Sequence, residues 1–79
     1  MFFYTYVLKS LRDGKLYVGW TNDLRKRIQA HNKGIVNATK NRNPLQLVYF
    51  EVGRNKEKAI KREKYFKTGF GRRFLKDRI

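Results

Sequence analysis

Arg27 and His31 stand four residues apart, a spacing that places both on one side of a helix. Leu24 and Ile28 share that side, so the two polar residues lie along the stripe that should face the core. A guanidinium beside an apolar stripe is costly unless it meets a carboxylate or a phosphate. The pattern therefore indicates an anion site. The alternative is that Arg27 reaches past the stripe to solvent and His31 is an ordinary residue at a helix end.

Three tyrosines are expected on one face of a sheet. Tyr4 and Tyr6 alternate along the first expected strand and so share a face. The hairpin that follows brings Tyr17 onto the same face, whether the turn is centred on Asp13–Gly14 or the register is shifted by two residues. We expect Gly19 to leave an open patch beside these phenols. The alternative is ordinary aromatic packing between neighbouring strands.

A carboxylate interrupts the apolar side of a second expected helix. Glu63 lies at the centre of the face formed by Ala59, Ile60, Phe66 and Lys67. A carboxylate in such a place should be paired with a cation, protonated or bound to a metal ion. Because the chain carries 20 lysines and arginines, an ion pair is the plain alternative to a metal site.

The elements that must position these residues follow from the hydrophobic periodicity. It predicts strands over residues 2–8, 16–19 and 45–52, and helices over residues 24–31, from Asn55 to before Gly69, and over residues 72–79. Strands and helices in this order are typical of a small α/β (α+β) domain.

Local signals set the ends of these elements. Asp13–Gly14 marks the turn of the first hairpin, residues 21–23 offer caps for the first helix, and Asn55 can cap the second. Gly69 and Gly71 are expected to break the second helix. We expect the last helix to turn three apolar residues inward, namely Phe74, Leu75 and Ile79.

The balance of charge predicts a polyanionic partner. The 79 residues carry 20 Lys and Arg against 6 Asp and Glu, a formal net charge of +14. Aromatic residues at 15% favour nucleic acid over a membrane surface, since no segment forms the long amphipathic helix that surface binding usually needs. Because cysteine is absent, there is no disulfide framework, and zinc fingers are excluded.

Six basic residues are candidate phosphate contacts. Two of them lie in a polar loop over residues 37–44, for which a plain solvated loop is the alternative. The others lie near the second strand, on the first helix or in the expected last helix. The six residues are Lys15, Arg27, Lys40, Arg42, Arg72 and Arg73.

The length predicts one domain over residues 1–79, with no room for a second functional module. The apolar residues 1–8 lack the basic region and cleavage site of a signal peptide and are too short to span a membrane. We therefore expect a cytoplasmic protein with no membrane partner. The sequence leaves a protein partner and the oligomeric state open.

Together these motifs resemble the GIY-YIG nuclease domain, most closely its small stand-alone bacterial members. The first motif reads Tyr4-Thr5-Tyr6, the second reads Tyr17-Val18-Gly19, the helix signature is Leu24, Arg27 and His31, and the acidic residue is Glu63. The likeness covers essentially the whole chain and extends to the nuclease domains of the excision-repair incision subunit and of homing endonucleases. Tyr4 and Thr5 stand where the family has Gly and Ile, and residues 68–71 lack the Asn that many members carry after the Glu.

This resemblance implies a single domain with a three-stranded antiparallel sheet flanked by helices. It also implies metal-dependent endonuclease activity on DNA phosphodiester bonds, in DNA repair or processing. Glu63 would bind one Mg²⁺ or Mn²⁺ and Arg27 would clamp the phosphate. Tyr6 is the favoured general base, if Lys15 and Arg27 stabilise its phenolate. The implied catalytic residues are Tyr6, Tyr17, Arg27, His31 and Glu63.

Two other classes of function stay open. A non-catalytic nucleic-acid-binding module would keep the fold and the basic surface but would show no metal-dependent cleavage. The intact set of site residues argues against this alternative, because a decayed site should lose them first. A protein-interaction adaptor is the third class, and only the missing Asn and the small size favour it.

The charge distribution generates a prediction about DNA binding. So small a basic domain offers many phosphate contacts and few groups that read bases, so affinity should depend strongly on salt and weakly on base sequence. Fluorescence anisotropy with unrelated duplexes should show affinity falling at least about tenfold between about 50 and about 200 mM salt. A flat response over that range would contradict the prediction.

Overall fold

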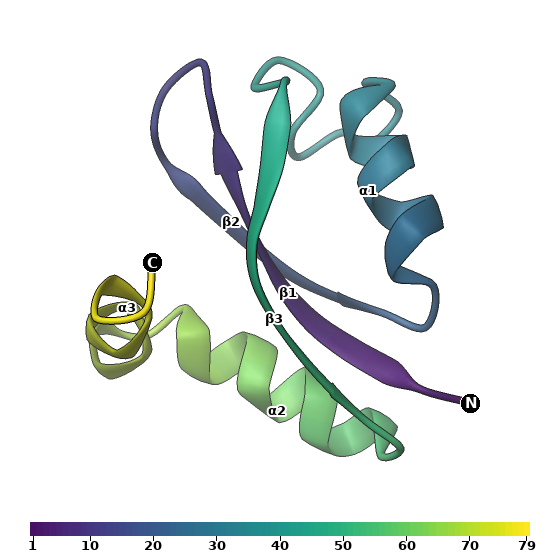
Figure 1. Ribbon diagram of the computed structural model, residues 1–79, viewed down its shortest axis with the longest axis vertical. Helices are drawn as coiled ribbons and strands as arrows, with labels where there is room; N and C mark the ends of the chain where they lie inside the picture. The colour runs from purple at the N-terminus through teal and green to yellow at the C-terminus, as the bar shows by residue number, and fades with distance from the viewer.

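The computed structural model describes residues 1–79, which form three strands and three helices around one antiparallel sheet (Figure 1). The strand order is β2-β1-β3, so the first strand is central and the other two are edges. This α+β architecture confirms the expected fold class. The elements are β1 (Phe3–Ser10), β2 (Leu16–Thr21), α1 (Leu24–Asn32), β3 (Leu45–Gly53), α2 (Lys56–Phe66) and α3 (Gly69–Lys76).

The register of the first hairpin is shifted by two residues from the one that a two-residue turn on Asp13–Gly14 would give. Lys9 pairs with Leu16, and the Ser10 amide donates to the Lys15 carbonyl at 2.9 Å. A shift by two preserves which face each side chain occupies. The expectation that Tyr17 shares the face of Tyr4 and Tyr6 is therefore confirmed.

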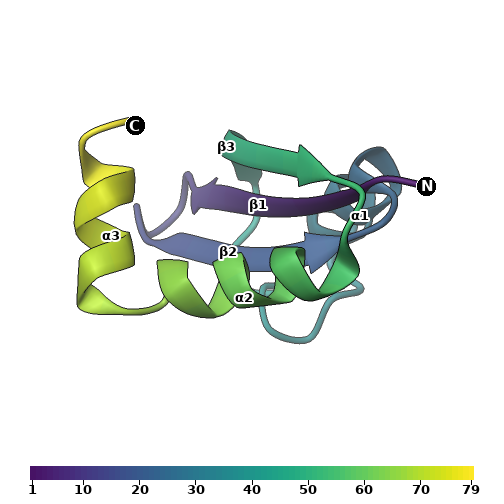
Figure 2. The same cartoon turned by 90° about the horizontal axis from the view of Figure 1, so that it is seen from below.

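Helices cover both faces of the sheet, as Figure 2 shows with α2 in front of the strands and α1 behind them. On the α1 side, Leu24 and Ile28 pack against a buried cluster built on Tyr6 and Leu8. On the other side, α2 and α3 complete a second cluster that contains Val7, Val18, Phe66 and Leu75. Consecutive residues of β1 thus face different cores, which explains why both of its faces are apolar.

Side-chain caps begin the first two helices where the sequence predicts them. Asp23 accepts a hydrogen bond from the Lys26 amide at 3.1 Å, and Asn55 accepts one from the Lys58 amide at 3.0 Å. Each cap satisfies an amide that has no partner inside its helix.

The start of the last helix differs from the sequence prediction. α3 begins at Gly69, three residues before the expected position, because the Thr68 hydroxyl caps it by accepting from the Gly71 amide at 3.1 Å. Leu75 is buried as expected, but Ile79 lies beyond the helix and is 47% exposed. The glycines therefore form the first turn of α3 and not a gap before it.

Gly71 lets α3 approach α2 closely. A Cβ atom at this position would lie 2.6 Å from the Phe66 Cα and would also clash with the Tyr65 carbonyl. Both obstacles are backbone atoms, so they cannot move aside as a flexible side chain could.

No helix of the protein has the length and apolar composition required to cross a membrane.

The tight approach at Gly71 generates a prediction about stability. Gly71→Ala should lower the free energy of unfolding by about 1–3 kcal/mol, because the new methyl group forces the two helices apart. Gly69→Ala is the matched control, since a Cβ there meets no atom within 4 Å. Urea unfolding should show the control unchanged or slightly more stable. Equal stability of both variants would contradict this account of the helix junction.

Candidate active site

The Tyr6 side chain packs between the sheet and α1, with only 1% of its surface exposed. Its ring crosses Gly19 on β2, where a Cβ atom would be 2.5 Å from the Tyr6 hydroxyl oxygen. The expectation of an open patch beside Gly19 is therefore wrong: the Tyr6 ring fills the space. Only glycine on the neighbouring strand leaves room for this phenol.

His31 holds the Tyr6 hydroxyl from the α1 side. Its Nε2 atom lies 2.9 Å from the Tyr6 oxygen, and its Nδ1 atom lies 2.6 Å from the Thr39 hydroxyl. The ring is fully buried, and burial, with a smaller contribution from Arg27, lowers the pKa of His31 to about 4. His31 is therefore neutral near pH 7, with both nitrogens engaged.

Thr39 is a site residue that the sequence analysis missed. It lies in the loop between α1 and β3, where the polar composition indicated phosphate contacts or a plain solvated loop, yet its side chain is fully buried. No local pattern marks it, because its partner His31 is eight residues away and the contact depends on how the loop folds back.

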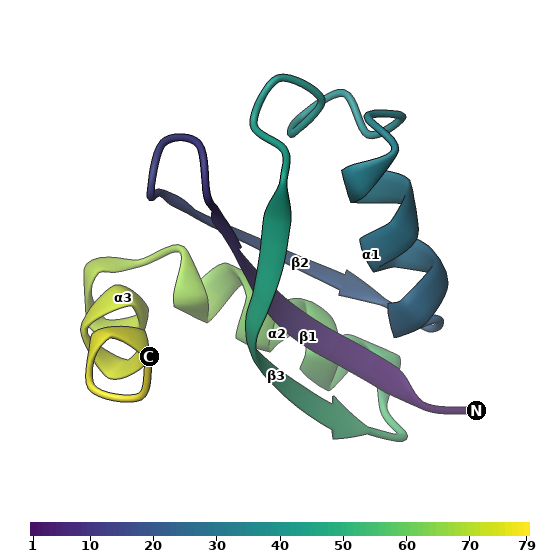
Figure 3. The same ribbon diagram turned by 45° about the horizontal axis from the view of Figure 1, so that its top comes forward.

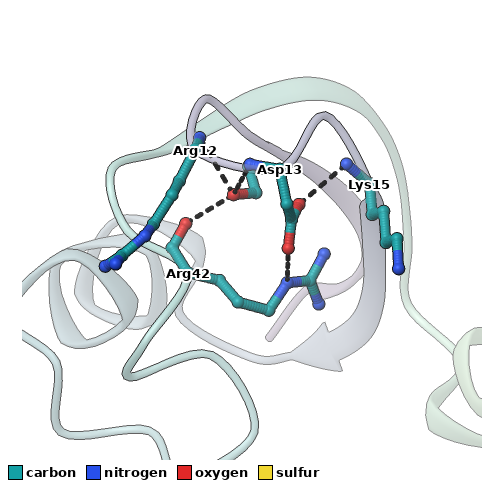
Figure 4. A network of polar contacts seen from close by, with 5 residues as sticks. Arg12, Asp13, Lys15 and Arg42 are labelled. Carbon is teal, nitrogen blue, oxygen red and sulfur yellow. Dashed lines mark hydrogen bonds and ion pairs between the residues drawn. The ribbon is translucent and has the colours of Figure 1, made fainter.

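The loop that carries Thr39 is tied to the first hairpin by the contacts that Figure 4 shows. The Arg42 Nε atom lies 3.0 Å from an Asp13 carboxylate oxygen, and the Ser10 hydroxyl donates to the Arg42 carbonyl. The Asp13 carboxyl also accepts from the Lys15 amide, which is the largest of the causes that lower its pKa. Arg42, a candidate phosphate contact, is thus engaged with Asp13.

Arg27 lies beside Tyr6 and its positive charge has no acidic partner. Its Nε atom is 3.4 Å from the Tyr6 hydroxyl oxygen, and this hydrogen bond is the main cause that raises the pKa of Arg27. The guanidinium is half-buried and forms no ion pair with any carboxylate. A half-buried cation without an anionic partner is a ready site for phosphate.

Tyr17 completes the cluster as its more exposed phenol. Its ring centroid lies 5.0 Å from that of His31 and 6.5 Å from that of Tyr6, and the side chain is half-buried. Tyr4 lies further along the same face and packs against Phe50, with 6.1 Å between ring centroids. Two of the three phenols therefore join the site.

Burial argues against Tyr6 as the general base in this arrangement. Desolvation outweighs the hydrogen bond and charge of Arg27, so the pKa of the Tyr6 phenol is raised. A phenolate is thus disfavoured where the sequence analysis placed it. The Tyr6 hydroxyl oxygen instead lies within hydrogen-bond distance of both the Arg27 Nε atom and the His31 Nε2 atom.

Glu63 approaches from the opposite layer of the fold. Its side chain is 20% exposed and its nearest cation is Lys67, one turn along α2, at 3.6 Å. Its negative charge is one of the smaller causes that raise the pKa of Tyr6, so it lies within electrostatic reach of the cluster. The structure thus brings four of the five predicted catalytic residues into contact and sets Glu63 apart.

A divalent cation at Glu63 would depend on one protein carboxylate. No group of three His, Asp or Glu side chains in the chain could hold a metal ion. Mg²⁺ often binds through one or two carboxylates, several waters and substrate phosphate, so the partly exposed Glu63 fits such a cation.

The remaining candidate phosphate contacts stay at the surface. Their side chains are exposed and form no ion pairs, which leaves them free to meet a polyanion. They come from the residue before β2, the loop after α1, and α3. These residues are Lys15, Lys40, Arg72 and Arg73.

Comparison with known proteins connects this geometry to a family. The sequence model of the GIY-YIG catalytic domain family matches residues 2–76 of this chain. A UPF0213 protein of Clostridium perfringens is 52% identical over 65 residues, which cover 81% of this chain and 69% of that protein. A UPF0213 protein of Staphylococcus saprophyticus is 47% identical over 66 residues, which cover 82% and 79%. The solution NMR structure of a UPF0213 protein from Bacillus halodurans superposes with a TM-score of 0.60 at 31% identity, covering 98% of this chain and 84% of that one.

The buried His31 generates a prediction about pH. The unfolded chain takes up a proton on His31 near pH 6.5, whereas the folded protein does so only near pH 4. The free energy of unfolding should therefore fall as pH decreases from 6.5 to 4, by up to about 1.4 kcal/mol per pH unit. Urea unfolding should show a flatter profile for His31→Gln.

His31 is the one histidine of the chain, so its titration can be followed directly by NMR. The pKa values of the Asp13 and Glu51 carboxyls are lowered in the folded protein, so protonation of these groups at low pH also reduces the free energy of unfolding. This loss is the same in the wild type and in His31→Gln. A histidine that titrates near pH 6.5 in the folded protein would refute the buried, neutral assignment.

Proposed function

This chain belongs to the GIY-YIG catalytic domain family, and we propose that it is a metal-dependent endonuclease that hydrolyses phosphodiester bonds in DNA. The observation that carries the proposal is the unpaired Arg27 guanidinium beside a buried Tyr6–His31 pair. A structural arginine in this position would be expected to have a carboxylate partner. Arg27 has none, which suits a phosphate that arrives with the substrate.

Arg27 and Tyr17 are the groups we assign to contact with the substrate. The planar fork of Arg27 can donate to two non-bridging phosphate oxygens and stabilise the charge that develops on them during attack. Tyr17 is half-buried beside this position, so its hydroxyl is the candidate that orients the attacking water.

Tyr6 and His31 are the groups we assign to positioning. The buried Tyr6 hydroxyl fixes one end of Arg27, and His31 fixes Tyr6. Because His31 is held on its other side by Thr39, the ring cannot turn towards a substrate without losing a buried hydrogen bond. These contacts keep the Arg27 fork in one place before substrate binds.

Glu63 is the residue we assign to the divalent cation. Mg²⁺ or Mn²⁺, when bound, neutralises phosphate charge and lowers the pKa of a coordinated water. The Lys67 ion pair at 3.6 Å is long and partly exposed, so Glu63 can exchange this partner at little cost.

DNA is the substrate we propose, for a role in DNA repair or processing in the cytoplasm. The net charge of +14 and the exposed, unpaired cations support a polyanion. The second candidate is a nucleic-acid-binding module without cleavage. The lack of a three-ligand metal cluster and the Glu63–Lys67 pair favour that candidate.

Glu63 separates the two candidates. Glu63→Gln keeps the size of the side chain and removes its charge, so nicking of supercoiled plasmid in Mg²⁺ or Mn²⁺ should be lost. The free energy of unfolding should change by less than about 1 kcal/mol, because the pair with Lys67 is partly exposed. DNA affinity in EDTA should be retained. The control is Glu57→Gln on the exposed first turn of the same helix, which should nick at the wild-type rate.

Two outcomes would contradict this assignment. Wild-type nicking by Glu63→Gln would end the role of Glu63 as a metal ligand. Tight DNA binding by the wild-type protein, with no cleavage of duplex, flap or single-stranded DNA in either metal, would favour the binding module.

A further inference from the structure

We propose that a groove on the far side of the sheet from Tyr6 and His31 binds a nucleoside phosphate. The groove has a volume of about 510 Å³ and lies between the start of β1, the end of β3 and the first turns of α2. Figure 3 shows these segments together near the N-terminus of the chain, with α1 on the other side of the sheet. The groove is therefore separate from the cluster of Tyr6, His31 and Arg27, and it shares only helix α2 with Glu63.

The single acid in the groove is already neutralised. Glu51 forms two hydrogen bonds with the Arg62 guanidinium, at 2.8 and 2.9 Å, and accepts a third from the Tyr49 hydroxyl. These contacts lower the pKa of Glu51, with the Arg62 hydrogen bond as the main cause. Glu51 thus remains charged but contributes little field to repel an incoming anion.

Two other cations of the groove have no acidic partner. Arg54 and Lys58 both line it, both are exposed, and neither takes part in an ion pair. The Arg54 guanidinium stacks over the Phe2 ring at 5.5 Å, which holds its position while leaving its N–H groups free. The groove therefore carries an unbalanced positive charge.

The backbone at the start of α2 adds to this field. Asn55 caps the Lys58 amide, whereas the amides of Lys56 and Glu57 begin the helix and have no partner within it. The positive end of the helix dipole lies at the same place. Glu57, the acid of this turn, does not line the groove. Phosphate is the anion that suits two side-chain cations and backbone amides together.

The groove is larger and more apolar than a bare phosphate site. Phe3, Val52 and Ala59 are its apolar lining residues, and the hydroxyl of Thr5, which also lines it, donates to the Ala59 carbonyl at 2.9 Å. An aromatic ring beside cations is the combination that holds a base next to its phosphate. We therefore assign the apolar wall to the nucleoside and the cations to the phosphate.

The first test is an NMR titration of the isotope-labelled protein in EDTA, so that cleavage plays no part. Thymidine 5′-monophosphate should shift the amide signals of Thr5, Gly53 and Asn55. Thymidine, which lacks the phosphate group, and inorganic phosphate, which lacks the nucleoside, should each bind more weakly than the monophosphate. Equal binding of thymidine and its monophosphate would overturn the role of the cations, and shifts confined to Tyr17 and Arg27 would overturn the site.

Variants test which cations hold the phosphate. Arg54→Ala and Lys58→Ala should each weaken binding of the monophosphate about tenfold, because each removes a charge-assisted contact. Lys61→Ala is the matched control, since Lys61 is exposed on the same helix but does not line the groove. All three side chains are exposed, so the thermal midpoints should stay close to that of the wild type. Unchanged binding in both groove variants would overturn the proposal.

A short oligothymidylate distinguishes the source of the nucleotide. Groove shifts with the oligomer alone would assign the groove to a nucleotide within a strand, and shifts with the monophosphate as well would assign it to a free nucleotide. No groove shift with either ligand at millimolar concentration would overturn the proposal. A protein that binds thymidine monophosphate but never cleaves DNA would refute the nuclease assignment and leave this site intact.

Discussion

Burial of the Tyr6 hydroxyl is the constraint on which the site depends. A phenol removed from water must have hydrogen-bond partners, and Arg27 and His31 supply them from α1. The ring of His31 is buried in turn, so its second nitrogen needs Thr39. The loop that carries Thr39 must therefore fold back over the sheet, and the Asp13–Arg42 pair ties that loop to the first hairpin. One buried oxygen thus links three segments that are distant in sequence.

The distribution of ion pairs explains how so basic a chain can fold and still attract a polyanion. Three carboxylates, Asp13, Glu51 and Glu63, each pair with one cation. The Arg62 partner of Glu51 also packs its guanidinium 4.6 Å from the centre of the Phe66 ring, so this pair belongs to the core as much as to the surface. Most of the 20 cationic side chains are left exposed, where they repel one another and favour binding to an anion.

Helix α2 connects the two faces of the protein. Its buried residues Ala59 and Phe66 pack against the sheet, its first turn borders the groove, and Glu63 carries a negative charge towards Tyr6. Gly71 of α3 lies close against the backbone of the last turn of α2, at Tyr65 and Phe66. The packing that builds the second core thus also places the backbone that carries the proposed metal ligand.

The sequence by itself determined the local features. Alternation along β1, the caps Asp23 and Asn55, and the four-residue step from Arg27 to His31 depend only on near neighbours, and the structure has them as expected. Tertiary structure decided the rest. Tyr6 fills the space over Gly19, Thr39 reaches His31, and Arg42 pairs with Asp13. Gly71 lets α3 approach the backbone of α2. Each of these contacts depends on which distant segment lies alongside. The same burial raises the pKa of Tyr6 and lowers that of His31, since desolvation depends on all the surrounding segments and not on any one motif.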